Sequence, residues 1–105
     1  MRIIVWSATA IDQYDNAIDY LARQNQPAAA RLAERIETAI LALAKRPIGR
    51  PGERAGTFEK RILKTSYLLV YSLSGGPDGE LRIHRIFHMS QNWRGWDFSQ
   101  DEGQT

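Results

Sequence analysis

The first half of the chain carries one short apolar run, followed by two stretches with helical periodicity. Residues 2–6 (RIIVW) are mostly apolar and β-branched, which predicts a strand. Apolar residues then recur every three or four positions opposite an aspartate-rich face, at Ile11, Tyr14, Ile18 and Leu21. After a break at residues 25–27 (NQP), a second stripe follows at Leu32, Ile36, Ile40 and Leu43. Because the break is so short, the two predicted helices should form an antiparallel hairpin.

The second half predicts three strands behind a constrained loop. Residues 46–56 hold two prolines, three glycines and three arginines, which indicates a loop with a defined path. The strand candidates are residues 57–63, 67–73 and 80–87, joined by hairpin turns that make them antiparallel. The predicted fold is therefore α+β in the order β-α-α-β-β-β. A helical hairpin packs on a mainly antiparallel four-stranded sheet.

Side-chain alternation along the last strand assigns its residues to two faces. One set is more apolar and should face the helices: Leu81, Ile83, Arg85 and Phe87. The other set should line the open face of the sheet: Arg82, His84, Ile86 and His88. Arg85 fits the helix-facing set poorly.

Composition limits the chemistry available to this chain. Its 105 residues suffice for one domain, and the absence of cysteine excludes disulfides, thiol nucleophiles and cysteine-based metal sites. The longest apolar runs are too short for a membrane span, and the N-terminus does not resemble a signal peptide, so we expect a cytoplasmic protein. Glycine-rich phosphate loops and serine nucleophile elbows are absent as well. We therefore expect neither a cofactor nor a metal.

Charge is distributed unevenly along the chain. Residues 1–44 carry four basic and five acidic side chains, whereas residues 45–94 carry ten basic and four acidic ones. Residues 95–105 are acidic, and we expect residues 97–105 to be a disordered tail behind a single domain of residues 1–96. The basic half indicates a surface for a polyanion or an acidic partner, or a solvated basic sheet face with no ligand.

Histidine and arginine on the last strand could serve phosphodiester cleavage. A histidine can move the proton, while arginines stabilise the charge that develops on phosphorus. His88 is the stronger candidate than His84, because it lies at a strand end, where functional sites collect. The alternative is that both histidines are ordinary strand residues.

Aromatic residues offer a second set of candidates. Tyr67 and Tyr71 share a face of the middle strand and are expected in the core. Trp93, Trp96 and Phe98 could pack back on the domain, stack on a base or form an apolar patch for a partner. Packing back on the domain is the preferred interpretation.

The order of these segments resembles the RelE/ParE superfamily of toxins from bacterial type II toxin–antitoxin systems. Residues 5–36 (VWSATAIDQYDNAIDYLARQNQPAAARLAERI) are similar to the helical hairpin of the family. Residues 47–62 (PIGRPGERAGTFEKRI) are similar to its proline- and glycine-containing loop, and residues 81–93 (LRIHRIFHMSQNW) to its last strand. The resemblance implies a compact α+β toxin that a small antitoxin, encoded beside it, neutralises in a hetero-oligomer.

The resemblance also implies one of two targets. RelE-like members cut messenger RNA in the ribosome, whereas ParE-like members inhibit DNA gyrase. Leu68 stands where the nuclease branch usually carries an arginine, and leucine cannot stabilise phosphate charge. A ParE-like gyrase inhibitor is therefore favoured, and an inactive binding module is a further alternative. If the chain is a ribosome-dependent ribonuclease, the candidate catalytic residues are Arg61, Lys64, Arg82, Arg85 and His88.

Overall fold

Two polar side chains set where the helices begin. The structure is a computed structural model that describes residues 1–90. The Oγ of Ser7 accepts a hydrogen bond from the backbone N–H of Ala10 (3.0 Å) and caps α1 (Ala8–Gln24). Asn25 caps α2 (Gln26–Lys45) in the same way through Ala28 (3.0 Å), and Pro27 occupies its first turn. The predicted hairpin is confirmed.

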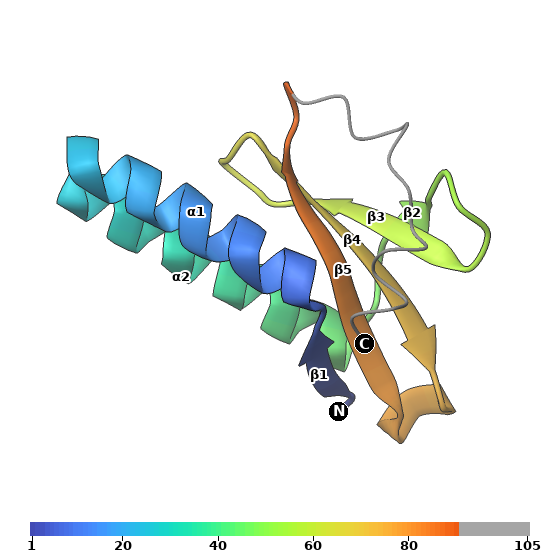
Figure 1. The fold of residues 1–105 in the computed structure, drawn as a ribbon. Coiled ribbons are helices and arrows are strands. Elements are labelled where there is room, and N and C mark those ends of the chain that lie inside the picture. Colours follow the sequence, from blue (N-terminus) through green and yellow to red (C-terminus); the bar gives the residue numbers. More distant parts are fainter. Residues whose placement is uncertain (91–105) are drawn as a thin grey trace.

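The sheet is mixed and contains five strands rather than the predicted four. The strands are β1 (Ile3–Trp6), β2 (Arg50–Pro51), β3 (Thr57–Arg61), β4 (Tyr67–Ser74) and β5 (Glu80–His88). Their spatial order is β1-β5-β4-β3-β2, with β1 parallel to β5 and the other neighbours antiparallel. The helical hairpin covers one face of this sheet and extends past its β1 edge (Figure 1).

The additional strand comes from the segment that the sequence predicts as a loop. Arg50 pairs with Glu59 and Pro51 with Phe58, so two residues of the loop extend the sheet beyond β3. Pro51 is tolerated there because β2 is an edge strand, whose outer side needs no backbone donor. The proline and glycine content of residues 46–56 predicts a loop throughout, although two of these residues form a short strand.

The main core lies between the hairpin and the sheet. Ile36, Ile40 and Leu43 of α2 are at most 2% exposed and belong to one cluster with Leu69 and Tyr71 of β4. The predicted stripe of α2 is thus the stripe that is buried. Tyr71 is fully buried and stacks on Phe58, with ring centroids 5.6 Å apart, which confirms that this tyrosine belongs to the core.

A β-bulge at His84 changes which residues of β5 face the helices. Val70 pairs with Arg85 but Tyr71 pairs with Ile83, so His84 is an extra residue on β5. Ahead of the bulge Leu81 and Ile83 face the helices as predicted. Beyond it the predicted alternation is wrong.

The corrected assignment follows from the cross-strand partners. Ile86 packs in the main core, while Phe87 clusters with Leu68 and Val70 on the opposite face, which we call the outer face. Arg85 pairs with Val70, so it too belongs to the outer face. A regular strand would have placed Arg85 on the helix side, in the main core, and the bulge keeps its guanidinium out of that core.

The start of α1 holds β5 beyond the end of β1. The Ser7 hydroxyl donates to the carbonyl of His84 (2.8 Å), and the Gln13 side-chain carbonyl accepts from the N–H of Ile86 (2.7 Å). These side chains satisfy backbone groups that no strand covers. Within residues 1–90, no helix is long and apolar enough to cross a bilayer.

Candidate functional site

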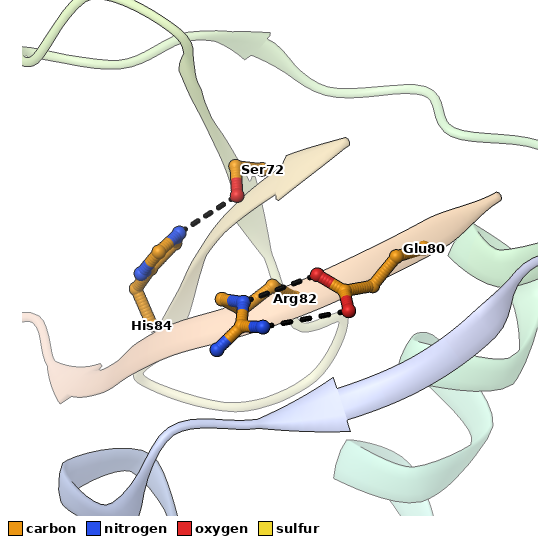
Figure 2. A network of polar contacts seen from close by, with 4 residues as sticks. All are labelled: Ser72, Glu80, Arg82 and His84. Carbon is orange, nitrogen blue, oxygen red and sulfur yellow. Dashed lines mark hydrogen bonds and ion pairs between the residues drawn. The ribbon is translucent and has the colours of Figure 1, made fainter. Parts of the chain in front are cut away.

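Polar side chains of β4 and β5 meet on the outer face of the sheet. Ser72 Oγ lies 2.7 Å from Nε2 of His84, and Arg82 pairs with Glu80 through Nε–Oε2 (3.1 Å) and Nη2–Oε1 (3.4 Å) (Figure 2). Regular alternation places Arg82 and His84 on the same face, and the bulge brings Arg85 to that face as well. Because the Arg82 guanidinium is already paired with the Glu80 carboxylate, Arg82 has less capacity to bind a phosphate.

Arg85 continues this face toward a small apolar cluster. Its side chain is 7% exposed, and its neighbours on the face include Val70, Leu68 and Phe87, all at most 6% exposed. Leu68, which replaces the arginine of the nuclease branch, is therefore a packed residue of the outer face. An arginine at that position would place a second guanidinium in the same cluster.

His88 faces the opposite direction from Arg82 and Arg85. It follows Ile86 on the helix side of β5, and its ring meets the Tyr67 ring edge-on at a centroid distance of 5.2 Å. Its Nδ1 accepts the backbone N–H of Ser90 (3.2 Å) and lies 2.7 Å from the Ser90 hydroxyl. Burial raises the pKa of Tyr67 above its ordinary value of 10.0.

The remaining two candidates lie near the turn between β3 and β4. Arg61 ends β3 and is exposed on the outer face, opposite Leu68. Lys64 is in the turn with a φ of 62°, and its carbonyl accepts from Nη1 of Arg35 (3.3 Å). A lysine in this left-handed conformation fixes the path of the turn at some cost in backbone energy.

The five candidate catalytic residues do not converge on one point. Arg61, Arg82 and Arg85 belong to the outer face, whereas His88 belongs to the helix side. Lys64 lines a surface pocket with His88 that contains neither Arg82 nor Arg85. Concerted proton transfer and charge stabilisation need these groups within hydrogen-bonding distance of one phosphate. The structure does not provide that arrangement among residues 1–90.

A basic groove beside α2 is the more coherent site. It has a volume of about 510 Å³ and lies between the C-terminal half of α2 and the β3–β4 turn. Its apolar wall includes Ile48 and Leu63, which are 59% and 73% exposed. Five cationic residues also line it: Arg35, Arg46, Lys60, Arg61 and Lys64. Glu34 is the one acidic residue among its lining residues in the described part of the chain.

A second hollow adjoins this groove on the outer face. It measures about 600 Å³, and Ile48, Lys60 and Arg61 line both spaces. Arg50 closes the outer hollow and pairs with Glu59, with Nε 3.6 Å from Oε1. Cationic side chains therefore lie on both faces of the sheet at its β2–β3 edge, where Lys60 and Arg61 line both spaces and Arg50 lines the outer hollow.

Gly49 allows the loop to lie closely over the core at this edge. A Cβ at this position would fall 2.3 Å from the Tyr71 hydroxyl and 2.9 Å from the Glu59 carbonyl, both too close for a side chain. Ile48 and Arg50, which line the two hollows, flank this contact. Burial raises the pKa of Tyr71, and the nearby Arg2 charge offsets part of that effect.

Three residues of the basic groove were not among the candidates from the sequence: Arg35, Arg46 and Lys60. The signal was present along α2 and its C-cap, where Arg35, Ala39, Ala42 and Arg46 recur at helical spacing beside the main apolar stripe. Leu63 was assigned to a strand, but β3 ends at Arg61 and leaves this leucine exposed in the turn.

Some sequence predictions fall on residues that the structure does not describe. Trp93, Trp96, Phe98 and the acidic tail of residues 97–105 lie outside the described residues 1–90. Within the described range, no three histidine or acidic side chains gather closely enough to hold a metal ion.

Comparison with known proteins adds an independent line of evidence. Residues 4–93 match the model of the ParE toxin of the type II toxin–antitoxin system parDE. Over 91 residues the chain is 33% identical to the protein named "Putative toxin Y4kP" of Sinorhizobium fredii, covering 86% of this chain and 91% of that one. A solved structure titled as a chromosomal ParDE TA system from P. aeruginosa shares the fold, with a TM-score of 0.71 at 22% identity. That match covers 84% of this chain and 96% of the other.

Proposed function

The chain belongs to the ParE toxin family of type II toxin–antitoxin systems, and from this premise we propose that it arrests growth by inhibiting DNA gyrase. Family membership also implies a cognate antitoxin partner, and we propose that this antitoxin neutralises the toxin by binding it. Gyrase acts on chromosomal and plasmid DNA, so the proposed place of action is the bacterial cytoplasm.

The observation that carries the proposal is the dispersal of the candidate catalytic residues over two faces of the sheet. A ribonuclease needs a proton-transfer group and cations around one phosphate. Here His88 lies on the helix side, while Arg82 is paired with Glu80 on the outer face. Inhibition of a large enzyme needs only a binding surface, and the cationic β2–β3 edge offers one.

The basic groove beside α2 supports the proposed antitoxin contact. Its exposed Ile48 and Leu63 suit the apolar side of an amphipathic segment, and its five cationic residues suit acidic side chains along the margins of that segment. We propose that an acidic amphipathic helix, or an extended tail, of the antitoxin fills this groove. Binding there would also cover Lys60 and Arg61, which face the outer hollow.

Purified protein distinguishes the gyrase target from the ribosome. We expect the toxin to abolish supercoiling of relaxed plasmid by gyrase and to leave ribosome-bound messenger RNA intact. Adding the antitoxin first should preserve supercoiling. Codon-dependent cleavage of the messenger with normal supercoiling would instead establish a RelE-like ribonuclease.

A His88→Ala variant sharpens this test. We expect it to inhibit gyrase nearly as well as the unaltered protein, because the binding proposal gives His88 no chemical role. Loss of toxicity, with the fold intact by circular dichroism, would favour the nuclease. Normal growth of cells that express the unaltered toxin without antitoxin would favour an inactive binding module.

A further inference from the structure

A second groove on the other side of α2 differs from the basic groove in both charge and backbone. It has a volume of about 730 Å³ and lies between β1, the start of α1 and the middle of α2. We call it the β1 groove. Its walls are mainly apolar and include Ile11 and Leu41, which are 46% and 48% exposed. Glu37 is the one ionic residue in its lining within the described chain, and its carboxylate accepts from the Tyr14 hydroxyl (2.6 Å).

One wall of this groove is the open edge of the sheet. Within residues 1–90, β1 pairs with β5 and has no strand on its other side. The N–H groups of Ile3 and Ser7 donate to Gly79 (2.8 Å) and Ile83 (2.9 Å), so the odd-numbered residues point their backbone groups toward β5. The backbone N–H and C=O of Ile4 and Trp6 must therefore point the other way.

The two sheet edges are not equivalent. The β2 edge is two residues long and contains Pro51, which discourages further pairing. The β1 edge contains neither proline nor charge between Ile3 and Trp6. An edge of this kind is a template for an added strand.

The shape of the opening favours one extended segment over a second folded copy. At one end the N–H of Arg2 donates to the carbonyl of Ala44 in α2 (3.1 Å), and at the other Ser7 begins α1. The hairpin extends past this edge of the sheet (Figure 1). A second copy would bring its own protruding hairpin to the same place, whereas a single strand can lie beside β1 under the helices.

We propose that an extended, uncharged apolar segment of the antitoxin adds to the edge of β1 as a sixth strand. This inference rests on the proposed function. The segment would exchange backbone hydrogen bonds with Ile4 and Trp6, and alternate side chains would pack against Ile11, Tyr14 and Leu41. The two grooves lie on opposite sides of α2, about one helix diameter (~10 Å) apart. A chain that passes over the exposed side of α2 follows about half its circumference, roughly 16–19 Å, which about five or six extended residues span, so one antitoxin chain can occupy both grooves.

Residue-resolved amide exchange of the full-length toxin, alone and with its full-length antitoxin, tests the added strand. We expect exchange at Ile4 and Trp6 to slow at least about tenfold in the complex, because their N–H groups gain partners. A stable complex in which both amides exchange as in the toxin alone would overturn the inference and leave the toxin–antitoxin pairing intact. Failure of the two proteins to associate would instead refute the proposed function, and the inference with it.

A pair of matched variants supplies a second test. Leu41→Glu places a carboxylate on the wall of the β1 groove beside Glu37, and should raise the Kd for the antitoxin about tenfold or more. Tyr20→Glu is the control, because Tyr20 is 63% exposed on α1 and lines neither groove. Both positions are exposed, so circular dichroism should show an unchanged fold. Equal affinity of the two variants would contradict the proposed strand.

Discussion

The two sides of helix α2 present the same kind of concave surface with different chemistry. On one side Arg35 and Arg46 join cationic residues of β3 and its turn around apolar side chains. On the other side Leu41 and Ile40 face an open strand edge with little charge. This difference fits the two contacts that we propose for the antitoxin, one that depends on charge and one that depends on backbone hydrogen bonds.

The largest predicted effect comes from reversing charge in the basic groove. The double variant Lys60→Glu/Arg61→Glu should weaken antitoxin binding about 10–100-fold at low salt, because two attractive contacts become repulsive. Titration calorimetry at two salt concentrations measures this change. Arg31→Glu, which lies on α2 but lines neither groove, is the control and should change affinity little.

Salt dependence separates the two grooves further. Unaltered toxin should lose affinity as salt rises, the double variant should lose much less, and Leu41→Glu should retain the salt dependence of the unaltered toxin. Identical salt slopes for all three proteins would remove the electrostatic distinction between the grooves.

The next prediction concerns Gly49, whose close contact with Tyr71 and Glu59 positions Ile48 in the wall of the basic groove. Gly49→Ala should destabilise the protein by about 1–3 kcal/mol, because its Cβ would overlap the Tyr71 hydroxyl and the Glu59 carbonyl. Urea unfolding measures the loss. In a Tyr71→Phe background part of the penalty should disappear, and a penalty that stays unchanged would locate the strain at the Glu59 carbonyl alone.

Substitution of Ser7, which follows β1, should reduce the free energy of unfolding by less than Gly49→Ala does. Ser7→Ala removes the cap of α1 and the hydrogen bond to the His84 carbonyl, and should cost about 0.5–2 kcal/mol. Urea unfolding again gives the value. Asn25→Ala removes the cap of α2 at an exposed position and should cost less, so the reverse ranking would contradict the importance assigned to the buried site.

The smallest predicted effect is a loss of stability at high pH through Tyr14 in the β1 groove. Burial, the hydrogen bond to Glu37, and the charges of Glu37 and Asp15 raise the pKa of Tyr14 from 10.0 to about 12. At pH 9 the tyrosine is protonated in both folded and unfolded chains. Between pH 10 and 12 the unfolded chain loses the proton first, so folding stability must fall.

Unfolding experiments at pH 9 and pH 11 test this sign. Tyr14→Phe should lose less stability than the unaltered protein between those two pH values. Some loss should persist, because burial also raises the pKa of Tyr67 and Tyr71. A larger loss in Tyr14→Phe would show that the Tyr14–Glu37 contact has been assigned the wrong role.

The sequence pattern was sufficient for both helices and for four of the five strands, β1, β3, β4 and β5. The stripe of Leu32, Ile36, Ile40 and Leu43 is the buried face of α2, since helical spacing alone brings these residues to one side. Arg50 and Pro51 were not recognisable as a strand, because their pairing depends on the distant Phe58 and Glu59. Local pattern carries no information about such partners.

The bulge at His84 shows a different limit. Alternation predicted one face for Leu81, Ile83, Arg85 and Phe87, and one inserted residue moved the last two to the other face. The one sign of this change in the sequence was Arg85, a charged residue in the set predicted to face the helices. The basic groove was also hard to see, because Arg35, Arg46 and Leu63 come from separate elements that only the fold brings together.

The central claim is that this toxin acts through binding surfaces and not by turnover of a substrate. Titration of the toxin against a fixed amount of gyrase, with supercoiling rate as the readout, tests it most directly. We predict a decline that ends at a fixed molar ratio of toxin to gyrase, with messenger RNA on ribosomes intact at the same concentrations. Unchanged supercoiling, together with many messenger molecules cut per toxin molecule, would contradict the claim.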